Sequence, residues 1–239
     1  MALDRPYYRI ARNVFNSGFI LDKRYASDRF SLVRAYHLIE DDLKRIIEFI
    51  EPADINENVF SHRLYELFLR CSTEFETNCK LILRYNGYEN TDLTIIDYYK
   101  INKATKLSEY EIKINVWHDE VKIIKPFSDW SKGHTLEWYQ DYNMVKHDRS
   151  KNFNKANFKN VVTAASCVLG VLCAQFDEYA FSLFHDEEIT SQSDEDGFMF
   201  GANSLLNIKP FDRWEETEKY NFSWEYIKDG ETPFRKYNF

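Results

Sequence analysis

The stretch NVFSHRLYELFLRCSTEFETNCKLILRYNGY, residues 58–88, decides the fold class. Its apolar side chains recur mostly at steps of three and four residues, which predicts a helix of about six turns with one apolar stripe. The stripe consists of Phe60, Leu64, Leu67, Phe68, Cys71, Phe75, Cys79 and Ile82. Asn86-Gly87 supplies a C-terminal stop. A stripe of this length is rarely left exposed to water, so we expect a partner helix of similar length.

Residues 157–184, NFKNVVTAASCVLGVLCAQFDEYAFSLF, supply that partner. The segment is apolar almost all round its centre, which is typical of the most buried helix of a bundle. Its small residues would let another helix approach closely. They are Ala164, Ala165, Ser166 and Gly170. A third helix is predicted from an N-cap at Ser27 or Asp28 to the stop at Pro52.

A change of period separates the two longest helices. After a short helix near residues 91–101, apolar and polar residues alternate over 110–116, and a turn at His118-Asp119-Glu120 precedes a second run at 121–125. This pattern predicts a β-hairpin inserted at about 108–127. The aromatic run from Tyr220 to Tyr226 reads as one strand face of a C-terminal tail. We expect this tail to fold back and join the hairpin in a small antiparallel sheet.

The fold class that follows is mainly α, a helical bundle with an inserted β-hairpin and an extended, aromatic-rich tail. The seven glycines and five prolines among 239 residues are few, which favours long helices over a loop-rich sandwich. We expect a bundle domain over residues 1–185, an acidic linker over 186–197 and the aromatic-rich extension over 198–239. The linker segment HDEEITSQSDEDG holds six acidic residues and no Lys or Arg.

Composition limits the classes of function. A formal charge of −8 argues against a general DNA-coating role, which needs a basic surface. No apolar window of about 18 residues is apparent and the N-terminus lacks a signal-peptide core, so we expect a cytoplasmic protein without a membrane contact. No cofactor or metal site is indicated. The four cysteines lack a CxxC pair and are expected to be buried thiols: Cys71, Cys79, Cys167 and Cys173.

The stretch WYQDYNMVKHDRS, residues 138–150, carries the candidate chemistry. On a helix, Asn143 and His147 share one face. Residues 146–159 contain five basic residues and one acidic residue, a local charge of +4 that would attract an anion. A histidine is the usual general acid or base for cleaving RNA through its own 2′-hydroxyl, and an adjacent Arg149 would stabilise charge on the phosphate. Alternatively, His147 caps a helix C-terminus and the bases line a solvated loop.

Two parts of the chain together resemble a HEPN domain, the all-helical module of many prokaryotic toxin and antiviral ribonucleases. Residues 63–83 resemble the first core helix of that family. The segment YNMVKHDR, followed by residues 157–184, resembles its last two helices, and residues 88–135 would then be an insertion. The family motif is an Arg, a polar residue that is often Asn, three further residues and a His. Asn143 and His147 match the polar residue and the His, whereas Tyr142 occupies the Arg position.

The resemblance implies a homodimer with an active cleft between two such helices. The implied function is a metal-independent endoribonuclease of bacterial defence or of a toxin–antitoxin pair, with an antitoxin or defence-complex protein as a further partner. Catalysis would rest on His147 and Asn143, and RNA phosphate would be bound by Lys146, Arg149, Lys151 and Asn152. The missing Arg favours an alternative, a catalytically inactive dimerisation module that binds a nucleotide or a partner. In a third reading, the acidic linker and tail cover the basic site as a built-in inhibitor.

Overall fold

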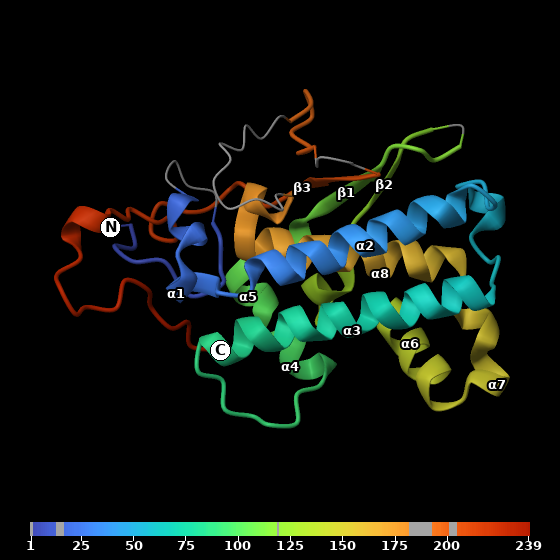
Figure 1. Cartoon of the computed structure of the whole chain (residues 1–239), viewed down its shortest axis with the longest axis horizontal. Helices are drawn as coiled ribbons and strands as arrows, with labels where there is room; N and C mark the ends of the chain where they lie inside the picture. Colours follow the sequence, from blue (N-terminus) through green and yellow to red (C-terminus); the bar gives the residue numbers. More distant parts are fainter. Residues whose placement is uncertain (1, 13–16, 119, 182–192, 201–204) are drawn as a thin grey trace.

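The computed structural model describes residues 2–12, 17–118, 120–181, 193–200 and 205–239. It is mainly helical with a small three-stranded antiparallel sheet, as predicted (Figure 1). Its long helices are α2 (Arg29–Ile47), α3 (His62–Tyr85) and α8 (Phe158–Phe176), and α8 packs against the other two. The shorter helices are α1 (Lys23–Ala26), α4 (Ile95–Tyr99), α5 (Ile101–Thr105), α6 (Glu137–His147) and α7 (Arg149–Asn152).

Local signals set the ends of α3. The Ser61 hydroxyl accepts a hydrogen bond from the backbone N–H of Leu64 at 3.2 Å, which satisfies a donor that the first turn leaves free. Gly87 follows the helix with a φ of +83°, a conformation that a residue without a Cβ adopts readily. Phe60 precedes the helix and is 48% exposed, so the apolar stripe begins at Leu64. The predicted stop at Asn86-Gly87 is confirmed.

Helix α2 ends at Ile47, five residues before the predicted stop at Pro52. Val33 and Leu43 face the core, but Phe30 and Leu38 lie on the solvent side, with 38% and 45% of their surface exposed. The predicted helix with its N-cap at Asp28 is therefore confirmed, while two of its large apolar residues do not contribute to the core.

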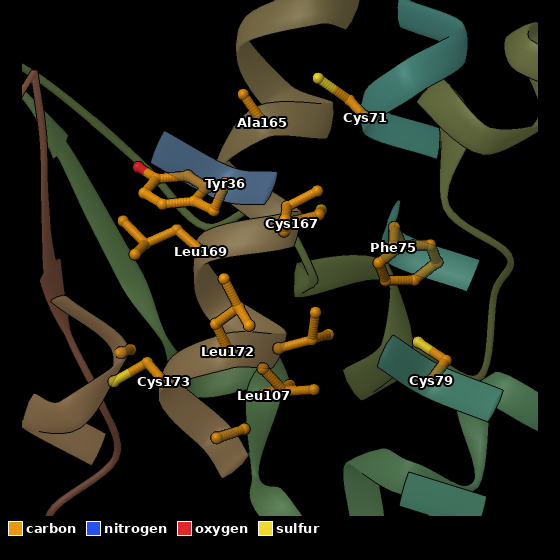
Figure 2. Close-up of a cluster of buried hydrophobic side chains, with 14 of the residues drawn as sticks. Tyr36, Cys71, Phe75, Cys79, Leu107, Ala165, Cys167, Leu169, Leu172 and Cys173 are labelled. Carbon is orange, nitrogen blue, oxygen red and sulfur yellow. The ribbon is translucent and has the colours of Figure 1, made fainter. Parts of the chain in front are cut away.

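Helix α8 forms the centre of the core, and Figure 2 shows its side chains between α2 and α3. The Asn157 side chain caps its first turn by accepting from the N–H of Asn160 at 2.9 Å. A Cβ on Gly170 would lie 2.5 Å from a ring carbon of Phe127. The close approach predicted at this position is therefore made by a single aromatic ring from the segment before α6, and not by another helix.

The four cysteines are free and buried, as predicted. Two lie on α3 and two on α8 (Figure 2). Burial disfavours the charged thiolate and raises the pKa of all four thiols, which makes them poor nucleophiles at neutral pH.

Within the described residues, the segment Phe158–Phe181 is long and apolar enough to cross a membrane by length and composition alone. The expectation that the chain holds no such stretch was therefore wrong. Most of its most apolar window is buried inside the fold, and the core helix of a soluble protein passes the same test. The segment is accordingly weak evidence for a membrane span.

The sheet consists of β1 (Glu111–Ile114), β2 (Lys122–Ile124) and β3 (Leu206–Lys209), in the order β2-β1-β3. Both pairings are antiparallel, and Ile112 lies opposite Ile124 on one side and Ile208 on the other. The inserted hairpin and its pairing with the C-terminal tail are confirmed. Asp119, in the predicted turn, lies outside the described residues.

The tail forms no strand over Tyr220–Tyr226, contrary to the prediction. It runs beside the N-terminal segment instead, and the Tyr220 hydroxyl donates to the backbone oxygen of Ile10 at 2.9 Å. The rings of Phe222 and Phe234 pack around Phe19, whereas Tyr226 is 72% exposed. The prediction of a single aromatic strand face is wrong because the rings of Tyr220 and Phe222 pack in a cluster around Phe19.

Candidate functional site

Helix α6 places Asn143 and His147 on one face. Its opposite face, with Trp138, Tyr142 and Val145, is buried against the bundle. Asn143 is half-buried and His147 is exposed, and their Cβ atoms are about 5–6 Å apart on a regular helix. Among the described residues, neither side chain has a hydrogen-bond or ion-pair partner. The predicted pair therefore faces solvent together, with its polar atoms available to a ligand.

Tyr142, at the position where the family motif has Arg, points into the core and is 3% exposed. Its ring meets Phe68 of α3 edge to face at 6.1 Å between centroids. Adjacent helical residues point about 100° apart, so a side chain that packs on α3 turns away from the face of Asn143 and His147. The position is occupied by a packing residue, and an arginine here would have to bury its charge.

A polar cluster between α3 and α6 engages Lys146. The Tyr139 hydroxyl donates to a Glu76 carboxylate oxygen at 2.9 Å, and Lys80 pairs with the other oxygen at 3.0 Å. The Lys146 ammonium lies 5.2 Å from the ring centroid of Tyr142 and hydrogen-bonds its hydroxyl, which raises the Lys146 pKa. Burial raises the Tyr142 pKa, with the Glu76 charge as a further cause. Lys146 is thus directed back toward α3.

The basic stretch after α6 is partly neutralised. Lys151 pairs with Asp148 at 3.3 Å, and Lys155 pairs with Asp141 at 3.0 Å. Asp141 lies outside the window over which the sequence shows a charge of +4, so the excess of positive charge in space is smaller than the sequence indicates. Hydrogen bonding to the Ser150 hydroxyl is the main cause of the lowered Asp148 pKa, which keeps this carboxylate charged near neutral pH.

Asn152 acts on the end of α6. Its side-chain nitrogen donates to the backbone oxygens of Met144 at 3.2 Å and Asp148 at 2.9 Å, which also accept the backbone N–H groups of Asp148 and Asn152. The capping role considered for His147 is therefore performed by Asn152. The hydrogen-bond donors of Asn152 are directed at the protein, in contrast to the exposed imidazole of His147.

Arg149 begins α7, immediately after Asp148 breaks α6 with a φ of −145° and a ψ of 78°. One residue, Asp148, separates it from His147, so the Cα atoms of Arg149 and His147 lie within about 7 Å of each other. The Arg149 guanidinium carbon is 5.4 Å from the ring centroid of Tyr65 on α3, a cation–π contact. The exposed site therefore joins an amide, an imidazole and a guanidinium on the corner between α6 and α7, hereafter the α6–α7 corner.

Sequence reasoning missed the α3 side of this corner. Phe153 lies in contact with His62 and Tyr65, at ring-centroid distances of 4.8 Å and 6.1 Å. One signal was present, because Tyr65 falls off the apolar stripe of α3 and is nevertheless aromatic. Such a residue often marks a second contact surface, but nothing in the sequence indicates that its neighbour is Arg149.

The α6–α7 corner lies apart from other features of the surface. A cavity of about 910 Å³ between α2 and α3 includes none of the predicted site residues in its lining. Residues 210–239 lie toward the opposite end of the bundle from α7, and β3 runs along the bundle beside β1 (Figure 1). Residues 205–239 therefore do not cover the basic stretch, which contradicts the inhibitor reading for this segment; residues 186–192 of the linker lie outside the described residues.

Chemically, the corner can bind an anion and exchange a proton. Arg149 offers paired donors to a phosphate, Asn143 a neutral donor and His147 a group suited to acid–base chemistry. Among the described residues, no group of three or more His, Cys, Asp or Glu side chains is arranged to hold a metal ion. Comparison of the chain with protein-family models, curated proteins and solved structures finds no match.

Proposed function

We propose that this chain is a HEPN-like, metal-independent endoribonuclease of bacterial defence or of a toxin–antitoxin pair, which binds RNA at the α6–α7 corner. The observation that carries the proposal is the exposed His147 imidazole, which shares a face with Asn143, has no partner among the described residues and stands beside Arg149. We further propose a cytoplasmic homodimer, with an antitoxin or defence-complex protein as a possible regulator.

The reaction uses the 2′-hydroxyl of the RNA as its nucleophile. His147 accepts the 2′-proton, the 2′-oxygen bonds to the phosphorus, and the bond to the 5′-oxygen of the next nucleotide breaks. The products are a cyclic 2′,3′-phosphate and a 5′-hydroxyl, whose proton comes from a second acid supplied by the other copy in the dimer. Arg149 stabilises the negative charge on the phosphate oxygens, and Asn143 hydrogen-bonds one of them.

His147→Ala tests this function. Purified protein is incubated with labelled single-stranded RNA in EDTA. We expect the variant to cleave the RNA at least about 100-fold more slowly than the wild type, the usual contribution of a general acid or base. Because the His147 side chain is exposed, the melting temperature of the His147→Ala variant should stay within about 1 °C of that of the wild type. His134→Ala, at another exposed histidine, is the matched control. Cleavage of the RNA by His147→Ala at the wild-type rate would refute the proposal.

A second candidate function is a non-cleaving module that binds a nucleotide or a partner protein. The buried Tyr142 favours it, because the paired Arg and His of the family motif are not both present on the exposed face. The same assay separates the two functions. Binding of the labelled RNA by the wild type with no cleavage after prolonged incubation supports the binding module, whereas metal-free cleavage rejects it.

A further inference from the structure

Four aromatic rings meet beside Arg149, and together they form what we call the ring platform. Phe153, from the 3-10 turn after α7, is at the centre, with Phe60 at 5.5 Å, His62 at 4.8 Å and Tyr65 at 6.1 Å between ring centroids. The three outer rings come from the start of α3 and the residues just before it. Segments about 90 residues apart in the sequence thus build one aromatic surface.

The ring platform is on the surface of the protein. Phe60 has 48% of its surface exposed, His62 is also exposed, and Tyr65 and Phe153 are half-buried. Rings that serve the core are buried in this structure, as Phe68 and Phe75 of the same helix are. The exposure leaves ring surface free to contact a planar ligand.

Attachment of the two segments does not explain the exposed ring of Phe60. Backbone hydrogen bonds already join them, from the N–H of Phe158 to the oxygen of Val59 at 2.9 Å and from the N–H of Lys159 to the oxygen of Glu57 at 3.0 Å. A backbone bridge also pairs Phe60 with Asn157. The main chain of Phe60 therefore provides the connection, and its side chain is left for another use.

A cation links the ring platform to the proposed phosphate site. The Arg149 guanidinium lies over Tyr65, whose ring is 6.1 Å from Phe153. Exposed aromatic rings next to a cation are the combination with which proteins bind single-stranded nucleic acid, because the rings stack on bases and the cation binds the backbone. Duplex RNA keeps its bases stacked inside the helix and cannot offer one to a protein ring.

We propose that the ring platform stacks one unpaired nucleobase of the RNA whose phosphate is bound at Arg149. The inference rests on the proposed function and specifies its substrate class, RNA with unpaired nucleotides. Phe60 and His62 supply the exposed ring surface, and Phe153 holds them in place. Removal of one ring should weaken binding of single-stranded RNA without changing the weaker, backbone-only binding of duplex RNA.

Phe60→Ala tests the ring platform. Affinities are measured by fluorescence anisotropy for a labelled oligouridylate and for a blunt RNA duplex of the same length, in EDTA and with His147→Ala as the background to prevent cleavage. We expect about tenfold weaker binding of the oligouridylate, within the range of base–aromatic stacking, and unchanged binding of the duplex. Phe60→Trp should restore the affinity. Tyr226→Ala, an exposed ring at the other end of the bundle, is the matched control and should change neither affinity.

The outcomes separate this inference from the proposed function. Two results would overturn the ring platform: unchanged oligouridylate binding when Phe60→Ala is added to the His147→Ala background, or duplex binding by that background as tight as its single-strand binding. If Arg149→Ala still weakens the binding of both RNAs in that case, the proposal that RNA binds at the α6–α7 corner stands without the ring platform. If the His147→Ala protein with an intact Phe60 binds neither RNA, the proposed function and the ring platform fail together.

Discussion

An arginine lies against an aromatic ring at each end of the bundle, but the two arginines differ in burial and in hydrogen bonding. At the tail end, the Arg12 guanidinium is buried, lies 4.7 Å from the ring of Trp214 and donates to the backbone oxygen of Glu218 at 2.6 Å. At the α6–α7 corner, Arg149 also lies on an aromatic ring, but it is exposed and has no hydrogen-bond partner among the described residues. A buried arginine whose two terminal nitrogens donate to the main chain, as those of Arg12 do, stabilises the fold, whereas an exposed one with free donors can bind a ligand.

Residue type and aromatic contact therefore do not identify a binding site by themselves. What separates Arg12 from Arg149 is the remaining hydrogen-bonding capacity of the side chain and its access to water. If this distinction is right, substitutions at the tail end change stability, and equivalent substitutions at the α6–α7 corner change RNA binding at nearly constant stability.

The largest effect is expected for Arg9→Ala. Arg9 is fully buried, donates to the Gln175 side chain at 3.0 Å and pairs with Asp28 at the start of α2. Its loss leaves the buried Gln175 oxygen and the half-buried Asp28 carboxylate without this partner and should cost about 3 kcal/mol, since leaving buried polar groups unpaired is destabilising. For a domain of this size the melting temperature should fall by about 10 °C.

Arg149→Ala is the matched control for Arg9→Ala. Thermal unfolding followed by circular dichroism should place its melting temperature within about 1 °C of the wild type, because surface substitutions seldom cost more than about 0.5 kcal/mol. Comparable losses of stability in both variants would break the comparison between the two ends.

A smaller effect is expected for a pair of asparagines that both bond the main chain. Asn86 is buried, donates to the backbone oxygens of Tyr8 and Ile82, and accepts from the N–H of Tyr237, each at 2.8 Å. Asn86→Ala should cost about 2 kcal/mol, because it leaves buried main-chain groups unpaired. Urea unfolding would measure it.

Asn152→Ala removes the corresponding contacts at the α6–α7 corner, where water can replace them. It should cost less than about 1 kcal/mol. If Asn152→Ala proved as destabilising as Asn86→Ala, the α6–α7 corner would be part of the rigid core, and its exposed groups would need another explanation.

The regular elements could be predicted from the sequence because their signals are local. Ser61 and Asn157 cap the helices that they precede, and Gly87 ends α3, all within one turn of the boundary that they mark. The burial of Tyr142 also follows from local spacing, since Trp138, Tyr142 and Val145 recur at steps of four and three. The sequence thus already indicated that the residue at the Arg position belongs to the core face of α6.

The parts that could not be predicted depend on distant contacts. The path of the tail is set by residues about 200 positions away, such as Ile10, which accepts from the Tyr220 hydroxyl. The charge of the basic stretch depends on Asp141, which pairs with Lys155 across a turn. The contact of Arg149 with Tyr65 joins helices 84 positions apart in the chain. Periodicity carries no information about such pairs.

The smallest effect concerns two aspartates whose pKa values are shifted in opposite directions. Asp177 follows α8, away from the α6–α7 corner; burial, with the charge of Glu178 as a second cause, raises its pKa to about 6. At the α6–α7 corner, the pKa of Asp148 is lowered. A carboxyl group whose pKa is raised by folding binds its proton more tightly in the folded state. Its favourable contribution is complete below about pH 4 and is lost as the pH rises through 6.

Asp177→Asn should therefore be as stable as the wild type at pH 4 and more stable by about 1 kcal/mol at pH 8, where the wild type must keep a poorly solvated charge. Asparagine has nearly the same shape as aspartate, so the unusual φ of +49° and ψ of −132° at this position should cost both residues about the same. Asp148→Asn should show the opposite sign: it is less stable than the wild type by a constant amount above about pH 4, and the loss disappears as the pH falls through the lowered pKa. Urea unfolding of both variants from pH 2 to pH 8 would measure the two slopes, that of Asp148 below pH 4 and that of Asp177 between pH 4 and pH 6. Equal slopes would mean that the two ends of the bundle do not differ in how they solvate charge. That difference is the physical basis for assigning a structural role to the tail end and ligand binding to the α6–α7 corner.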